Sequence, residues 1–225
     1  MQRRRDRAYT RFLSRVWLPL SCLITGSAQA APADLRKVAH AYYVWRDAAY
    51  PVSTSFLGDH RLDDKLTDYR MPAVLERRKH VSALLTQVGG MDVSSWSKED
   101  RVDQLLFLSQ LKAADFFGRR LDPERRDPQL YVTECTNGLF TLLQKEYAPP
   151  RVRALAAQKR LEAMPGLLRT ARTNLTQPVR LFAQLAIRAA REGDALYKES
   201  LAPLVAALSP EEQKRFAVAR DAALK

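Results

Sequence analysis

Apolar residues recur at steps of three and four along most of this 225-residue chain. Such spacing places apolar side chains on one face of an α-helix. No segment alternates apolar and polar residues for more than a few positions, as a half-buried strand would. The sequence therefore predicts an all-α fold, an irregular multi-helix bundle. The stripe expected in the first helix consists of Leu35, Val38, Ala39, Tyr42, Trp45 and Ala49.

Prolines, glycines and capping residues divide this pattern into separate helices. Asp34, Ser97 and Ser209 are the expected N-caps, and Gly118 is expected to end the helix that starts at Ser97. The expected helices span 34–50, 51–57 in part, 72–88, 97–117, 129–147, 150–163, 165–172, 178–197 and 210–225, with loops at 58–70 and 119–128. The helix over 97–117 is expected to bury a face made of Val102, Leu105, Leu106, Ser109, Ala113 and Phe116.

Residues 1–30 have the pattern of an export signal. Six arginines precede the short apolar stretch 16–24, and Ala28 and Ala30 form an A-x-A cleavage site. We expect cleavage after Ala30 and a periplasmic or secreted mature chain, 31–225. An uncleaved anchor is a weaker alternative because a membrane span needs about 20 apolar residues. A lipoprotein acylated at Cys22 is weaker still, because Pro19-Leu20-Ser21 is a poor acylation motif.

The net charge does not point to nucleic acid. The first 30 residues hold six Arg and one Asp, so their removal lowers the formal charge from +12 to +7. The remaining Lys and Arg alternate with Asp and Glu, which is typical of a solvated surface, and no aromatic and basic recognition motif is present. We expect no nucleic-acid partner and no stable membrane span after cleavage. Cys135 would then be the one cysteine, and we expect an inert thiol.

The residues contain no complete catalytic pattern. A zinc site on a helix would need two His four residues apart, and His40, His60 and His80 are isolated. The pair Asp63-Asp64 is expected to solvate a turn. No phosphate-binding glycine loop or nucleophile elbow occurs. The sequence therefore predicts no catalytic residue, no metal and no cofactor in this chain.

Several short segments nevertheless resemble a known family. Residues 56–64, Phe-Leu-Gly-Asp-His-Arg-Leu-Asp-Asp, followed by Leu66-Thr67-Asp68-Tyr69, are similar to a stretch of the bacterial domain-of-unknown-function 885 (DUF885) family. Further similar stretches follow in the order of the family and cover nearly all of 31–225. They are Asp127–Tyr131, Asn137–Phe140, Arg160–Pro165 and Ala171–Pro178, with Ala186-Ile187 downstream.

The resemblance implies a role for this chain within a larger fold. Family members are typically more than twice as long, and their distal half carries an H-E-A-x-P-G-H-H-like segment, which implies a zinc-peptidase-like activity. Nothing in this sequence matches that segment, so zinc is implied for full-length relatives only. We expect a non-catalytic or truncated N-terminal portion of a helical metallopeptidase-like fold that forms one wall of a substrate groove. Asp59, His60 and Arg61 are the groove candidates.

The expected partners are a peptide substrate or a missing C-terminal half. One alternative is a stand-alone periplasmic module that binds peptides or acts as a scaffold. Another is an enzyme reconstituted with a separately encoded distal half. If a distal half normally covers this chain, the helices should expose apolar surface, and the isolated chain should self-associate or be only marginally stable.

Overall fold

The computed structural model describes residues 30–193 and 195–225, so the predicted signal segment lies outside the described residues apart from Ala30. Within these residues every regular element is helical, and the all-α prediction is confirmed. The α-helices are α1 (Pro32–Ala49), α2 (Pro51–Phe56), α3 (Met71–Gly89), α4 (Lys98–Phe116), α5 (Pro123–Arg126), α6 (Pro128–Leu143), α7 (Pro150–Asn174), α8 (Arg180–Glu192), α9 (Ala202–Val205) and α10 (Pro210–Ala223). Two π-helical turns span Phe117–Leu121 and Leu196–Ser200.

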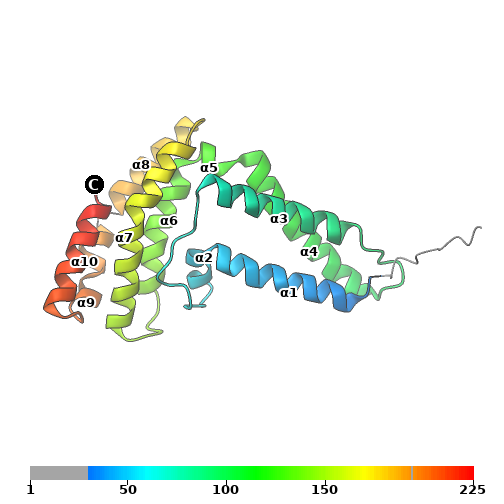
Figure 1. Cartoon of the computed structure of the whole chain (residues 1–225), viewed down its shortest axis with the longest axis horizontal. Coiled ribbons are helices and arrows are strands. Elements are labelled where there is room, and N and C mark those ends of the chain that lie inside the picture. Colours follow the sequence, from blue (N-terminus) through cyan, green and yellow to red (C-terminus); the bar gives the residue numbers. More distant parts are fainter. Residues whose placement is uncertain (1–29, 194) are drawn as a thin grey trace, which may run out of the picture.

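The helices form two packed groups. Helices α1, α3 and α4 extend to one side of the molecule, while α6 to α10 stand together on the other side, as Figure 1 shows. Each group has its own apolar core, because an amphipathic helix must bury its apolar face. The first core includes Leu35, Tyr42, Val81, Val88, Phe107 and Leu111. The second includes Tyr131, Leu139, Leu142, Leu161, Met164 and Phe216.

Local capping sets two of the helix starts that the sequence predicts. The Ser209 side chain accepts a hydrogen bond from the Glu212 N–H, and the Glu212 carboxylate accepts one from the Ser209 N–H, which completes a capping box. Ser97 likewise accepts from the Asp100 N–H. The prediction for Asp34 is wrong: α1 begins at Pro32, and Asp34 accepts a hydrogen bond from the Ala31 N–H. Proline is favoured at the first helical position because it has no N–H to leave unpaired.

The loop predicted over 119–128 is mostly helical. Helix α4 ends at Phe116 with Phe117 as its C-cap, so Gly118 occupies the expected C′ position, but the chain continues there as the π-helical turn, and α5 follows. Between them Asp122 has a φ of 48°, and its carboxylate and that of Glu124 each lie 2.6 Å from Arg78 of α3. A contact with a distant helix therefore shapes this segment, and local sequence patterns carry no information about such a contact.

Three further helix boundaries differ from the prediction. Helix α7 is continuous through Pro165, although proline removes a backbone hydrogen bond. Leu161, Met164 and Leu167 on either side are buried, so packing holds the helix together. Helix α6 ends at Leu143, four residues before the expected end, and the segment expected as one helix over 178–197 is divided into α8 and a π-helical turn.

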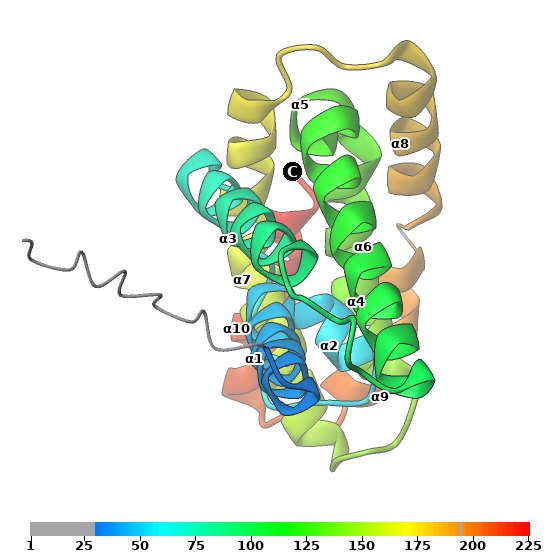
Figure 2. The same cartoon turned by 90° about the vertical axis from the view of Figure 1, so that its right-hand side faces the viewer.

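The predicted buried face of α4 is exposed. Leu105 is 61% exposed and Leu106 is 65% exposed, while Gln104, Phe107 and Leu111 face the core instead. We call the exposed residues Val102, Leu105, Leu106 and Phe116 the α4 stripe. Helix α8 also exposes Leu181, Phe182 and Ile187. In Figure 1, α4 lies behind α3 and α8 lies behind α7. Figure 2 shows the same helices after a turn of 90°.

Candidate functional site

The loop after α2 holds the three residues that the sequence singled out. Gly58 has a φ of 95°, a conformation that glycine adopts without strain, and it turns the chain away from α2. The Asp59 carboxylate accepts hydrogen bonds from Arg61 Nε at 2.9 Å and Nη2 at 2.5 Å. These bonds from Arg61 lower the pKa of Asp59 to about 2. Asp59 and Arg61 therefore form an ion pair, in which the Arg61 side chain is 83% exposed.

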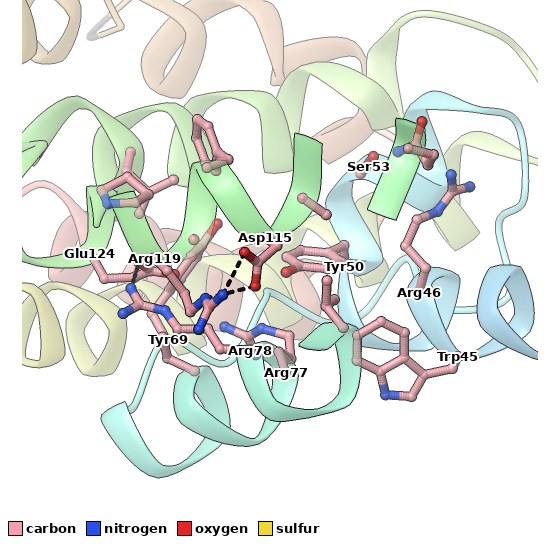
Figure 3. A pocket seen from close by; sticks show the side chains of 18 of the residues that line it. Trp45, Arg46, Tyr50, Ser53, Tyr69, Arg77, Arg78, Asp115, Arg119 and Glu124 are labelled. Atoms are coloured by element: carbon pink, nitrogen blue, oxygen red, sulfur yellow. Dashed lines mark hydrogen bonds and ion pairs between the residues drawn. The ribbon is translucent and has the colours of Figure 1, made fainter. Parts of the chain in front are cut away.

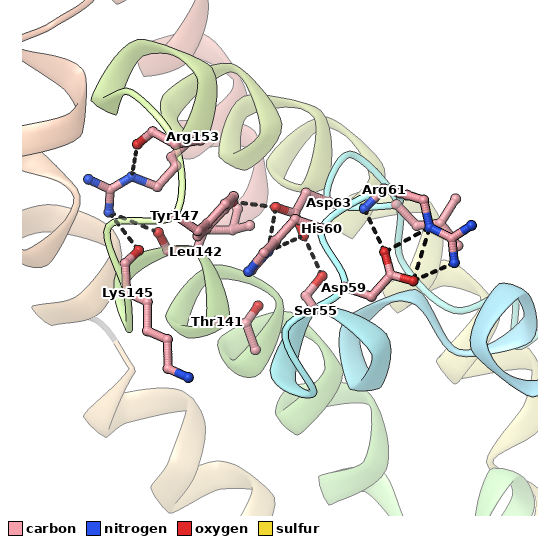
Figure 4. A network of polar contacts seen from close by, with 12 residues as sticks. Ser55, Asp59, His60, Arg61, Asp63, Thr141, Leu142, Lys145, Tyr147 and Arg153 are labelled. Carbon is pink, nitrogen blue, oxygen red and sulfur yellow. Dashed lines mark hydrogen bonds and ion pairs between the residues drawn. The ribbon is translucent and has the colours of Figure 1, made fainter. Parts of the chain in front are cut away.

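His60 points inward from the same loop. Its Nδ1 lies 3.0 Å from Asp63 Oδ2, and its ring is stacked on Tyr147, with 3.3 Å between ring centroids. The Tyr147 hydroxyl donates a short hydrogen bond to the same Asp63 carboxylate. Figure 4 shows His60, Tyr147 and Asp63 lying against one another. His60 is thus held by two partners within the fold.

Asp63 belongs to a buried polar network and does not solvate a turn, which corrects the prediction for this residue. Its Oδ1 accepts a hydrogen bond of 2.5 Å from the Ser55 hydroxyl. Arg160 of α7 is completely buried and lies 3.8 Å from the same oxygen. A buried guanidinium must be paired and hydrogen-bonded, because its desolvation is costly. Arg160 donates to Ser55 Oγ, Thr141 Oγ1 and the carbonyls of Lys65 and Gly138.

A shallow hollow of about 390 Å³ lies between this loop and α7. His60, Arg61, Asp63 and Asp64 line it together with Val152, Leu155, Ala156, Gln158 and Lys159. Arg61 is the most exposed of the three groove candidates, because the Asp59 and His60 side chains are 31% and 21% exposed. A contact of Asp59, His60 or Arg61 with a substrate stays a prediction.

A second cavity, which the sequence did not indicate, lies between α1, α3 and α4. Its volume is about 280 Å³, and its walls include Tyr50, Tyr69 and Trp45. Four arginines also line it: Arg46, Arg77, Arg78 and Arg119. Figure 3 shows the Arg77, Arg78 and Arg119 side chains gathered near Asp115. We call this cavity the arginine pocket.

Three of the four arginines already have carboxylate partners. Arg46 lies 2.8 Å from Asp47, and Arg119 lies 2.7 Å from Asp115. Arg78 lies 2.6 Å from both Asp122 and Glu124. The charges of these arginines are therefore compensated within the protein.

Arg77 differs from the other three. It is 9% exposed, and its Nη1 donates to the Asp68 carbonyl at 2.7 Å. Its guanidinium carbon lies 5.2 Å from the centre of the Tyr50 ring and 5.8 Å from that of Tyr69, which are cation–π distances. Its buried Nη2 has no hydrogen-bond acceptor in the part of the chain that the structure describes. Burial raises the pKa values of both Tyr50 and Tyr69, so both phenols are neutral.

The remaining candidates for chemistry are separate from these sites. Among residues 30–193 and 195–225, no three His, Cys, Asp or Glu side chains gather to hold a metal ion. Cys135 is free and buried, as expected, and burial raises its pKa to about 12. The His80 ring packs on Trp45 at 4.2 Å between centroids. None of the described helices is both long and apolar enough to cross a membrane.

Comparison with known proteins places the fold in a family. Residues 51–225 match the family described as "Bacterial protein of unknown function (DUF885)". The chain belongs to this family. Residues 58–64 lie within the matched range, and the resemblance to this family noted in the sequence is confirmed. No match was found among curated proteins.

One solved structure of similar fold is a candidate lipoprotein of unknown function from Shewanella oneidensis. The TM-score is 0.74 at 21% sequence identity, over 86% of this chain. At this identity the likeness shows a shared fold. The DUF885 chain spans about a third of the length of that protein, 35%.

Proposed function

We propose that this chain is a non-catalytic helical portion of an exported DUF885 protein and forms one wall of a substrate groove. The rest of the DUF885 fold would pack against the side that carries the α4 stripe. The observation that carries the proposal is the exposure of this stripe, and α8 exposes further apolar side chains at Leu181, Phe182 and Ile187.

The physical argument rests on the cost of apolar surface in water. Fully burying one leucine side chain stabilises a protein by about 1.5–3 kcal/mol relative to leaving it exposed. Leu105 and Leu106 are adjacent and more than half exposed. A contiguous apolar surface of this kind usually marks an interaction site. The proposed occupant of this surface is the remaining part of the family fold. The solved relative contains such a part, because this chain matches only 35% of its length.

The proposed location is outside the cytoplasm. The pattern of residues 1–30 supports export with cleavage after Ala30. The described portion is compatible with this location, since Cys135 is buried as a free thiol and needs no disulfide partner. Arg61 is our first candidate for a groove residue, since its side chain is the most exposed of the three at the hollow beside α7.

The experiment is sedimentation velocity of the purified full chain over a range of concentrations. We expect reversible self-association, because the α4 stripe is uncovered. The double variant Leu105→Glu, Leu106→Glu should weaken association about tenfold or more, the loss expected for at least one buried leucine. The matched control is Val218→Glu, a side chain that is 71% exposed, on α10, which lies on the opposite side of the molecule from α4 in Figure 1.

The control should associate as the unaltered chain does. A monodisperse monomer at all concentrations, with a sharp unfolding transition at high temperature, would overturn the proposal. That result would favour the second candidate function, a stand-alone module that binds peptides. The arginine pocket is the observation that favours this second function, because it is already complete within the described residues.

A further inference from the structure

The arginine pocket combines three features that together indicate a ligand. It has a volume of about 280 Å³, close to the lower end of small-molecule sites, which begin at about 300 Å³. Its walls are aromatic on the side of Trp45, Tyr50 and Tyr69. It also contains two buried arginine donors, Arg77 Nη2 and Arg78 Nε, that have no acceptor among the described residues. Buried donors in native proteins are nearly always paired, and Arg77 calls for an explanation because no carboxylate contacts it, unlike Arg78.

The charge of the missing partner follows from the ion pairs. Arg46, Arg78 and Arg119 each have a carboxylate within 2.8 Å. Arg77 contacts a backbone carbonyl and the Tyr50 and Tyr69 side chains, and no described carboxylate lies within ion-pair distance of it, although its charge helps to lower the pKa of Asp68. Arg77 is therefore the pocket arginine that has room for an anionic partner, whereas Arg78 already contacts two carboxylates. A singly charged anion can pair with Arg77, and Asp115 and Glu124, which also line the pocket, repel it less than they would repel a dianion.

From this geometry we propose that the arginine pocket binds a monocarboxylate with an apolar body, as at the C-terminal residue of a short peptide. Nη2 of Arg77 donates a hydrogen bond to the carboxylate, and the aromatic wall packs on the apolar part. Guanidinium groups suit carboxylates because their N–H groups are fixed in one plane. The site lies within α1, α3 and α4 and their neighbours, so it goes beyond the proposed function and does not need the α4 stripe.

The test is isothermal titration calorimetry on the purified full chain, with N-acetyl-phenylalanine as the probe. We expect saturable binding to one site. The uncharged amide of the same compound should bind at least about tenfold more weakly, because it cannot pair with the guanidinium. Inorganic phosphate serves as the competing anion. No binding of the carboxylate, equal binding of the amide, or tighter binding of phosphate would overturn the proposal.

Two variants connect the binding to this pocket. Arg77→Gln removes the charge but keeps a donor for the Asp68 carbonyl, and we expect it to weaken binding about tenfold or more. Ala114→Leu keeps every charge and fills the cavity, so it should also abolish binding while circular dichroism confirms the fold. Arg101→Gln, an exposed arginine on α4, is the control for a general loss of charge and should bind as the unaltered chain does.

The Leu105→Glu, Leu106→Glu variant separates the two proposals. It should keep saturable binding of N-acetyl-phenylalanine even where self-association is lost, since neither leucine lines the pocket. Loss of binding in this variant, with unchanged binding in Ala114→Leu, would place the ligand on the α4 stripe and overturn the pocket proposal.

Discussion

Arg160 of α7 lies 3.8 Å from the Asp63 carboxylate in the loop after α2, and the arginine is completely buried. Ser55 joins the two, since its hydroxyl donates to Asp63 and accepts from Arg160 Nη2. Burial lowers the pKa of Arg160, and the nearby Asp63 opposes this effect. The pair thus ties the 58–64 loop to the core helices, and the loop geometry depends on it.

Replacement of Arg160 by methionine should destabilise the protein by about 3–5 kcal/mol, because it leaves Asp63 buried without its counter-ion. Urea unfolding followed by circular dichroism measures the change. Lys159→Met is the control, since this neighbour is 61% exposed and its surface ion pair contributes less than about 1 kcal/mol. Adding Asp63→Asn to Arg160→Met should cost less than the sum of the two single changes. Full additivity would show that the two residues are not coupled.

Gly138 of α6 should not tolerate a side chain. A Cβ atom there would lie 3.0 Å from Leu66 Cδ2, so we expect Gly138→Ala to destabilise the protein by about 1–3 kcal/mol. Gly166 of α7 is the matched control, because its Cβ would meet only Arg169 Nη2 at 3.8 Å. Gly166→Ala should stabilise by about 0.5–1 kcal/mol through helix propensity. Thermal unfolding gives the stability of the Gly138→Ala and Gly166→Ala variants. Equal changes in stability would contradict the close packing at Gly138.

Stability should fall at alkaline pH, in part through Cys135. Burial raises the pKa of this thiol to about 12, against about 8.5 in an unfolded chain. The folded protein keeps this proton where the unfolded chain loses it, so the contribution is complete below about pH 8.5 and is lost as the pH rises toward 12.

Urea midpoints at about pH 8 and pH 10 check this prediction. Cys135→Ala should reduce the loss of stability between about pH 8 and pH 10. Part of the loss should remain, because burial also raises the pKa of Tyr131. A variant with the same loss as the unaltered protein would exclude a contribution of the thiol. Cys22→Ser is the control, because Cys22 lies in the predicted signal segment.

Processing should produce a chain that begins at Ala31, because Ala28 and Ala30 form the cleavage site. The new ammonium group would lie beside Asp34, whose Oδ2 is 3.1 Å from the Ala31 nitrogen. An acidic residue in the first turn favours a helix start, so α1 should persist after cleavage. N-terminal sequencing of the envelope fraction measures the outcome. Met1 at the terminus, or an acylated Cys22, would contradict it.

Some features of the loop after α2 and of the arginine pocket could be predicted from the sequence, and others could not. Glycine at position 58 and the acidic and basic residues after it indicated an irregular loop, and Gly58 does adopt a positive φ there. The inward position of His60 could not be predicted, because its partner Tyr147 follows α6 and is remote in the chain. Arg77 and Arg78 are indistinguishable in the sequence. Only the structure shows that Asp122 and Glu124 pair with Arg78, whereas Nη2 of Arg77 has no acceptor among the described residues.

The sequence by itself determined the helical class and the helix starts at Ser97 and Ser209, because periodicity and capping act within one or two turns. Only the tertiary structure decided that α7 continues through Pro165 and that α4 buries Gln104 and Phe107 while it exposes Leu105 and Leu106. The physical reason is that periodicity shows how apolar a face is, whereas burial depends on which surface packs against it. That surface comes from residues far away in the chain.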